Sequence, residues 1–177
     1  MGPPVTGNNV ALSLDVTITD WLRIQHVEFR DILHKIELAQ HDPGSTGAAD
    51  VRRLLKRLLP RLKAHEAVED DLLSPVLRKQ IKGIEPGLTS IFMDGHEELH
   101  EKIDRLQQAL DMGTAPLSQF VAAVDFESLL KEHMEQEERI LFPIIEKTLA
   151  RQDQEDLAVQ AGALAAKLLA PVGKKAR

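Results

Sequence analysis

His133-Met134-Glu135-Gln136-Glu137-Glu138-Arg139-Ile140-Leu141-Phe142-Pro143 is the segment that decides how the chain is interpreted. If this segment is helical, His133 and Glu137 stand one turn apart on the same face, so an imidazole and a carboxylate can reach one common point. This spacing is typical of metal ligands. The pattern also occurs earlier, in His65-Glu66-Ala67-Val68-Glu69-Asp70-Asp71-Leu72-Leu73-Ser74-Pro75, with the His, the Glu, the next acid, the Leu and the Pro in the same order.

The repetition extends to the helix that precedes each of these segments. His26 and His96 lie in matched contexts, because an apolar pair follows each of them at helical spacing. Each half of the chain therefore predicts a helix with one histidine, followed by a helix with a His-x-x-x-Glu pair. We expect an all-α fold in which two helical hairpins form an antiparallel up-down four-helix bundle with approximate internal symmetry.

Apolar residues recur every three to four positions over long stretches of the chain. The stretches cover about 20–40, 48–82, 88–112, a fourth from 116 past Pro143, and a shorter one at about 152–170. Segments rich in Gly and Pro, near 42–47, 83–87 and 113–116, predict the turns between the long helices. Pro60, Pro75 and Pro143 lack an amide donor, which predicts kinks, or a break at Pro75.

The same patterns predict the domain organisation. We expect a flexible lead over residues 1–15, the bundle over 16–150, and a C-terminal amphipathic helix with a basic tail over 151–177. The last helix is rich in alanine and carries apolar residues on one side. We therefore expect a short fifth helix that packs on the bundle or on a second subunit, and the sequence leaves a homodimer open.

Composition narrows the classes of function. A chain of 177 residues is long enough for one domain that buries about 70% of its unfolded surface. It contains no cysteine, so a metal must take nitrogen and oxygen ligands, and a reducing cytoplasm is the expected location. The net charge of −6, with basic and acidic residues interleaved, argues against nucleic acid as a partner. No apolar run approaches the ~20 residues of a membrane span, so we expect no membrane partner.

Seven polar groups fall on the inward faces of the predicted helices: His26, His65, Glu69, His96, His100, His133 and Glu137. Counted along the helices, they lie roughly 21 to 27 Å from the predicted turns, and so at a similar depth. A buried polar group without a partner costs about 1 to 3 kcal/mol, and metal ions would satisfy all seven. Five imidazoles and two carboxylates exceed the needs of one ion, so we expect two ions of iron, manganese or zinc. Nearby acids are expected on solvated faces, although one could orient a ligand imidazole: Glu66, Asp70, Glu97, Glu98 and Glu135.

This pattern resembles the hemerythrin family, the HHE cation-binding domains, over about residues 18–148. It consists of a lone His on the first helix, His65-x-x-x-Glu69 on the second, His96-x-x-x-His100 on the third, and His133-x-x-x-Glu137 before Leu-Phe-Pro on the fourth. The resemblance implies a non-haem di-iron centre, with two iron ions bridged by both carboxylates and an oxo or hydroxo group. It implies that His96, His100 and His133 hold one iron, that His26 and His65 hold the other, and that Glu69 and Glu137 form the bridge.

Two positions bear on the details of this site. Arg30 occupies the place in the first hairpin that His100 occupies in the second, and a guanidinium cannot donate a lone pair to a metal. The iron of the first hairpin would therefore keep a coordination position for a small ligand. Invertebrate hemerythrins carry the second carboxylate five residues after the last histidine, where this chain has Glu138. Glu137 lies about 40° from His133 around a helix and Glu138 about 140°, so we favour Glu137.

Three functions are compatible with these patterns. The first is a non-haem di-iron protein that binds dioxygen, nitric oxide or peroxide for sensing, storage or detoxification. The second is an iron sensor or an iron donor to other proteins. The third is a metal-free helical interaction or phosphotransfer module, although no histidine has the setting of a phosphotransfer site. The chain contains no tyrosine, which removes the usual redox-active phenol and favours a binding protein over a turnover enzyme.

Overall fold

A computed structural model of the protein describes residues 15–41, 45–80, 86–112 and 116–170. The described residues form α-helices and two π-helical turns, and none of them forms a strand, so the all-α prediction is confirmed. In chain order the elements are α1 (Ile18–Gln40), α2 (Ser45–Val68), η1 (Glu69–Leu73), α3 (Ser74–Gln80), α4 (Pro86–Met112), α5 (Pro116–Gln136), η2 (Glu137–Leu141), α6 (Phe142–Thr148) and α7 (Arg151–Leu169). The predicted lead, most of the predicted turn residues and the basic tail lie outside the described residues.

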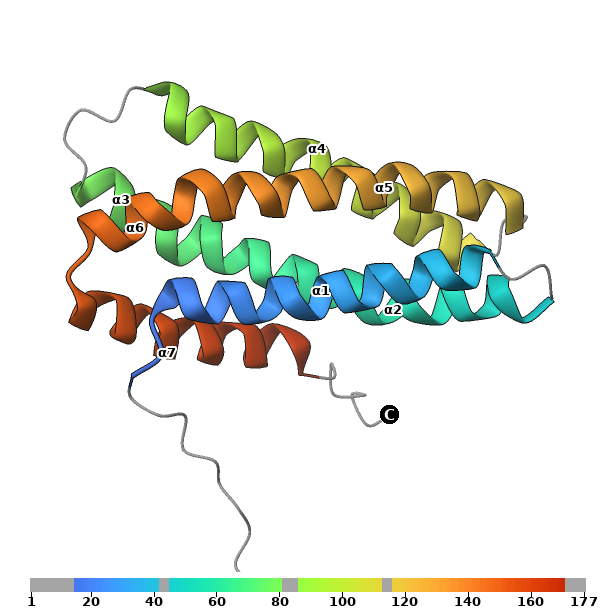
Figure 1. The fold of residues 1–177 in the computed structure, drawn as a ribbon, viewed down its shortest axis with the longest axis horizontal. Coiled ribbons are helices and arrows are strands. Elements are labelled where there is room, and N and C mark those ends of the chain that lie inside the picture. The colour runs from blue at the N-terminus through green and yellow to red at the C-terminus, as the bar shows by residue number, and fades with distance from the viewer. Residues whose placement is uncertain (1–14, 42–44, 81–85, 113–115, 171–177) are drawn as a thin grey trace, which may run out of the picture.

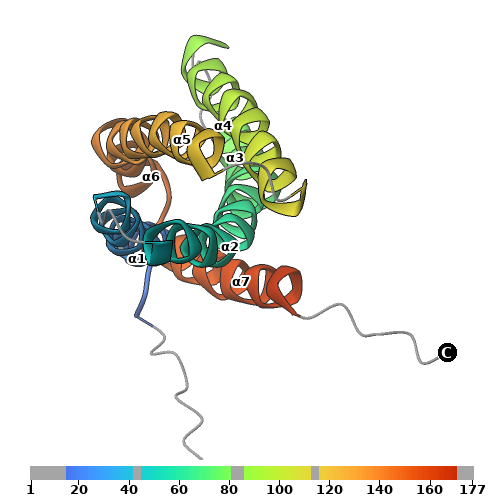
Figure 2. The same cartoon turned by 90° about the vertical axis from the view of Figure 1, so that its right-hand side faces the viewer.

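Four long rods make up most of the molecule (Figure 1). The first is α1, the second runs through α2, η1 and α3, the third is α4, and the fourth runs through α5, η2 and α6. The end-on view in Figure 2 shows these rods around a common interior, with α7 on the outside. The helix α7 packs against α2 and α1 of the same chain. The fifth helix therefore covers its own bundle, one of the two positions that the sequence allowed.

Both composite rods contain a π-helical turn next to a proline. In η1 the amide of Ser74 donates to the carbonyl of Glu69, and in η2 the amide of Phe142 donates to the carbonyl of Glu137. Pro75 follows Ser74 and cannot donate to the residue four positions before it, so a wider turn accommodates the missing donor. The rod does not break at Pro75. Pro60 lies inside α2, which also continues past it.

A polar layer divides the core of the bundle into two apolar clusters. The larger cluster contains Phe29, Leu55, Ile103 and Leu130, together with their buried neighbours. The smaller cluster contains Leu22, Val68, Leu73, Phe142 and Leu157, and so includes α7. Along α1 and the two composite rods, the inward histidines and glutamates lie near the boundary between the two clusters, while the described side chains of α4 after His96 belong to the larger cluster. The core therefore holds these polar side chains in a layer with apolar packing above and below.

The start of α1 is fixed by a capping box. The side-chain oxygen of Thr17 accepts a hydrogen bond from the amide of Asp20, and the carboxylate of Asp20 accepts one from the amide of Thr17. The hydrogen bond from the Thr17 hydroxyl lowers the pKa of Asp20, against the opposing effect of burial. This cap sets where α1 begins, and so the register that turns His26 inward.

Along the described part of the chain, none of the helices combines the length and the apolarity that crossing a bilayer requires.

Replacement of the capping threonine tests the role of this helix start. Thr17→Ala removes the side-chain acceptor for the amide of Asp20, so we expect the free energy of unfolding to fall by about 1 kcal/mol. Thr17→Ser keeps the hydroxyl and serves as the control, with little expected loss. The measurement is urea denaturation followed by circular dichroism. Equal stability of the alanine and serine variants would contradict the assignment.

Candidate metal centre

Every rod contributes to the polar layer. The contributing side chains are His26 from α1, His65 from α2, Glu69 from η1, His96 from α4, His133 from α5 and Glu137 from η2. All six residues are buried, and Glu137 is completely inaccessible. These histidines and glutamates lie at a similar height along all four rods. Side chains that are far apart in the sequence therefore meet in one layer.

The two π-helical turns begin at the two glutamates. Glu69 is the first residue of η1, and Glu137 is the first residue of η2. A π-helical turn holds more residues than an α-helical turn. The acid after each glutamate therefore points in a different direction from the one that α-helical spacing would give. Single π-helical turns inside α-helices occur frequently at functional sites. In this protein both of them coincide with a carboxylate that points into the core.

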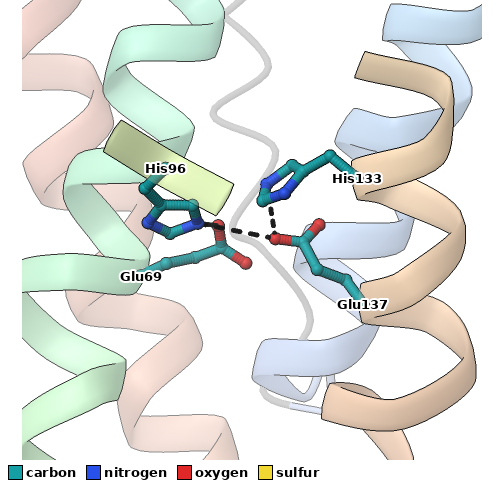
Figure 3. Close-up of side chains that lie close together, drawn as sticks. All are labelled: Glu69, His96, His133 and Glu137. Atoms are coloured by element: carbon teal, nitrogen blue, oxygen red, sulfur yellow. Dashed lines mark ion pairs between the residues drawn. The ribbon is translucent and has the colours of Figure 1, made fainter. Parts of the chain in front are cut away.

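Four side chains from η1, α4, α5 and η2 form one group of candidate ligands, shown in Figure 3. Nε2 of His133 lies 2.8 Å from Oε1 of Glu137, and Nε2 of His96 lies 3.7 Å from the same oxygen. Glu69 approaches from the other side, with Oε2 3.4 Å from Nε2 of His96. This group therefore offers two imidazoles and two carboxylates.

His26, His65 and Glu137 form a second group. Nε2 of His26 lies 3.1 Å from Oε2 of Glu137 and 3.3 Å from Nε2 of His65. Oε2 of Glu69 lies 3.6 Å from Nε2 of His65. Glu137 thus presents one carboxylate oxygen to each group, as a bridging ligand would. The side chain that points inward is Glu137, the position that we favoured from the sequence.

The outer ring nitrogens of three histidines are held by acceptors. Nδ1–H of His26 donates to Glu138 at 2.9 Å, Nδ1–H of His96 donates to Asp70 at 2.8 Å, and Nδ1–H of His65 donates to the amide oxygen of Gln25 at 3.1 Å. Hydrogen bonds of this kind fix the tautomer and leave Nε2 as the inward atom with a lone pair. Glu138 and Asp70 each follow an inward glutamate, and each holds a histidine of the opposite hairpin.

The arrangement around His26 and His65 requires a positive charge between the inward atoms. Both Nδ1 atoms donate outward, so Nε2 of His26, which lies 3.3 Å from Nε2 of His65 and 3.1 Å from Oε2 of Glu137, either carries a second proton or faces a metal ion. Among the described residues, no hydrogen bond satisfies either oxygen of Glu69 or Glu137, or Nε2 of His96 or His133. A metal cation would satisfy all of these atoms at once. Nitrogen and oxygen donors of this type suit iron, manganese or zinc.

Without a metal, protons and charged pairs stabilise the site. Burial, together with the charge of Glu137, raises the pKa of Glu69 to about 7. Burial also opposes ionisation of Glu137, but the charges and contacts of His133, His26 and His96 outweigh it and hold its pKa well below the usual range. Burial lowers the pKa of His65 to about 3. Burial would likewise lower the pKa of His96, but contacts with Asp70, Glu137 and Glu69 outweigh it and raise this pKa to about 12.

The structure brings together six of the seven predicted ligands. His100 is the exception, because it lies outside both groups and its side chain is 47% exposed. Its Nε2 is paired with the carboxylate of Glu66, and this hydrogen bond raises the pKa of His100. His100 follows His96 by one turn, but its ring points to the side of α4 that faces α2.

Three of the acids that we placed on solvated faces are exposed there: Glu97, Glu98 and Glu135. For Glu66 the prediction is wrong, since this residue is completely buried. Asp70 is half-buried and orients His96. The repeat contained a signal for Glu66, because the matching position in the second hairpin is the buried Met134. Comparison of the two halves of the repeat could therefore have indicated that Glu66 is buried.

These observations define a helical bundle with a buried centre of histidines and carboxylates that is suited to metal cations. The family model of the hemerythrin HHE cation binding domain matches residues 17–145. The chain therefore belongs to the hemerythrin HHE cation-binding family, as the spacing of its histidines and glutamates predicted. No curated protein and no solved structure matches the chain.

The protonation of the metal-free site predicts how metal affinity depends on pH. Glu69, with a pKa of about 7, and His96, with a pKa of about 12, must lose protons before they can bind a cation. Affinity should therefore rise with pH, and binding should release more protons at pH 6 than at pH 8, where Glu69 is already ionised. Calorimetric titration with zinc in buffers of different ionisation enthalpy measures this release.

Asp70→Asn provides a matched variant for this titration. Loss of the aspartate charge lowers the pKa of His96, so fewer protons should be released at pH 8 than from the unaltered protein. Affinity that falls as pH rises, or proton release that is the same at both pH values in both proteins, would contradict the assigned protonation states.

Proposed function

We propose that the centre holds two iron ions and that the protein binds dioxygen or a related small molecule, nitric oxide or peroxide, for sensing, storage or detoxification. One observation carries this proposal: two buried groups of histidines and carboxylates lie side by side and share Glu137, which presents Oε2 to Nε2 of His26 at 3.1 Å and Oε1 to Nε2 of His133 at 2.8 Å. The proposed fold is the antiparallel up-down bundle of two hairpins over 16–150, with 151–177 as an appended segment.

The proposed ligands follow from the two groups. His26 and His65 would hold one iron, His96 and His133 would hold the other, and the two carboxylates would lie between them. Glu137 supports a bridging role because it presents a different oxygen to each group. Iron, when bound, would supply a redox-active centre that can coordinate a small oxygen or nitrogen ligand. The protein contributes fixed imidazoles, two negative charges and apolar packing that excludes bulk water.

The surroundings of the site support binding over turnover. Trp21, Phe29 and Phe142 pack around His26 and His65, with ring centroids 5.3 to 6.4 Å from the nearest imidazole. The chain has no tyrosine, so no phenol is present to pass an electron to the centre. A buried di-iron site without such a donor fits a protein that binds a small molecule and does not consume it in repeated cycles.

Elemental analysis tests the metal content. We expect two iron ions per chain, and we expect Glu137→Gln to hold fewer than one, because one carboxylate reaches both groups of ligands. Glu135→Gln removes the same charge from an exposed position two residues away and should keep both ions. A folded protein that holds no metal would instead favour a metal-free helical module.

Reaction with dioxygen tests the proposed ligand. When the reduced, iron-loaded protein is mixed with oxygen in a stopped-flow spectrometer, we expect a new visible absorption band. Reversal of the band when oxygen is removed would indicate storage, whereas conversion to the oxidised protein would indicate sensing or detoxification. The zinc-loaded protein is the control and should not respond, because zinc has no redox chemistry. An iron-loaded protein that is inert to oxygen, nitric oxide and peroxide would contradict the proposed function.

A further inference from the structure

Arg30 and His26 share one carboxylate oxygen of Glu138. Nδ1–H of His26 donates to Oε1 of Glu138 at 2.9 Å, and the guanidinium of Arg30 donates to the same oxygen at 2.8 Å. Arg30 follows His26 by one turn of α1, and Glu138 belongs to η2, on the rod that packs beside α1 (Figure 2). A cation is therefore paired with the carboxylate that holds a histidine of the centre.

This contact connects the surface to the buried layer. The imidazole of His26 is completely buried, whereas 31% of the Glu138 side chain and 39% of the Arg30 side chain are exposed. Solvent and salt screen the ion pair in part, but the hydrogen bond from Nδ1–H of His26 leads directly into the interior. A change of charge at Arg30 can thus reach His26 through a single carboxylate.

The hydrogen bond at Nδ1 governs how strongly an imidazole donates to a metal through Nε2. An ionised carboxylate that accepts from Nδ1–H makes the ring more basic, which stabilises a ferric ion more than a ferrous ion. A guanidinium on the same carboxylate oxygen offsets part of this negative charge and acts in the opposite direction. Arg30 should therefore favour the ferrous state of an iron ion held at Nε2 of His26.

The second hairpin has no counterpart of this contact. Asp70 matches Glu138 in the repeat and holds His96 at 2.8 Å, but among the described residues it has no ion pair with a lysine or an arginine. The position that matches Arg30 is His100, and an imidazole that binds a metal is neutral. The substitution of Arg for His in the repeat thus removes a possible ligand from the first hairpin and also adds a cation to it.

We propose that Arg30, acting through Glu138, raises the reduction potential of the iron ion that His26 and His65 hold. The inference rests on the proposed di-iron function and concerns how that centre is regulated, since dioxygen and nitric oxide bind to ferrous iron. Reduction adds one electron from an external one-electron reductant to a ferric ion, and no residue of the chain is oxidised. Arg30 is a positioning residue, because it acts through Glu138 and is not a ligand.

Potentiometric titration of the iron-loaded protein, followed by visible absorption, tests the inference. Arg30→Gln leaves the carboxylate of Glu138 to His26 alone, so one of the two midpoint potentials should fall. We expect the ferric-to-ferrous ratio at a fixed potential to rise about three- to tenfold, at the lower end of the effects of outer partners of ligand histidines. This change corresponds to about 30 to 60 mV for one electron. Arg30→Lys retains the positive charge and should keep most of the original potential.

Arg23→Gln is a matched control on the same helix. Arg23 is 41% exposed and pairs with Glu146 at 2.8 Å, but Glu146 holds no histidine among the described residues. This variant should change the midpoint potentials much less than Arg30→Gln. An equal change in both variants would indicate general surface electrostatics and would overturn the inference. An unchanged or higher potential in Arg30→Gln would overturn it as well.

A double-mutant cycle tests whether the effect passes through Glu138. Glu138→Gln keeps an acceptor for His26 without the negative charge, so the midpoint potential should rise. In that background, Arg30→Gln should change the potential less than it does in the unaltered chain. An effect of Arg30→Gln that is the same in both backgrounds would overturn the role of Glu138.

Two further measurements distinguish this inference from the proposed function. Elemental analysis should give two metal ions per chain in all of these variants, and loss of an ion in Arg30→Gln would overturn the inference alone. In zinc-loaded protein, the Nδ1–H proton resonance of His26 should move to higher chemical shift in Arg30→Gln, because its hydrogen bond to Glu138 becomes stronger. This measurement requires no iron chemistry, so an unchanged resonance would also overturn the inference alone. An unaltered protein without metal would overturn the proposed function as well.

Discussion

Two buried carboxylates facing four imidazoles are the constraint on which the rest of the structure depends. Glu69 and Glu137 lie between two apolar clusters, where an uncompensated charge is strongly unfavourable. In the metal-free protein the two carboxylates differ in protonation. Glu137 is ionised, while Glu69, with a pKa of about 7, takes up a proton near neutral pH. Cations can replace those protons at the same side chains. Metal binding and folding stability are therefore coupled through the same side chains.

The hairpins are braced across the centre by hydrogen bonds that follow the internal symmetry. In each hairpin, one acid points into the core and the next acid holds a histidine of the other hairpin, at 2.8 to 2.9 Å. The π-helical turns begin at these positions in both halves, next to the prolines that require them. Each π-helical turn thus accommodates the amide donor that the proline lacks. It also points the two consecutive acids in different directions.

Departures from this symmetry give the two sides of the centre different properties. Glu138 binds Arg30 as well as His26, with both contacts below 3 Å, while the matching residue Asp70 binds His96. Glu66 has no acidic counterpart, because the second hairpin has Met134 at that position. The side of the centre at His26 therefore has the Glu138–Arg30 contact beside its aromatic neighbours, and the side at His96 adjoins the polar contact of Glu66 with His100 between α2 and α4. A repeat gives two similar halves, and single substitutions within it can assign them different roles.

The sequence by itself determined the helical class, the positions of the long helices and the six side chains that converge. These features depend on spacing along one helix, where three to four residues per turn fix which side chains share a face. It could not decide the outcome for His100 and Glu66, because both lie near an inward face and their contact joins two helices. It also did not predict the π-helical turns that precede Pro75 and Pro143. Only the tertiary structure decided these features, because the partner of a buried charge depends on which neighbouring helix comes within hydrogen-bonding distance.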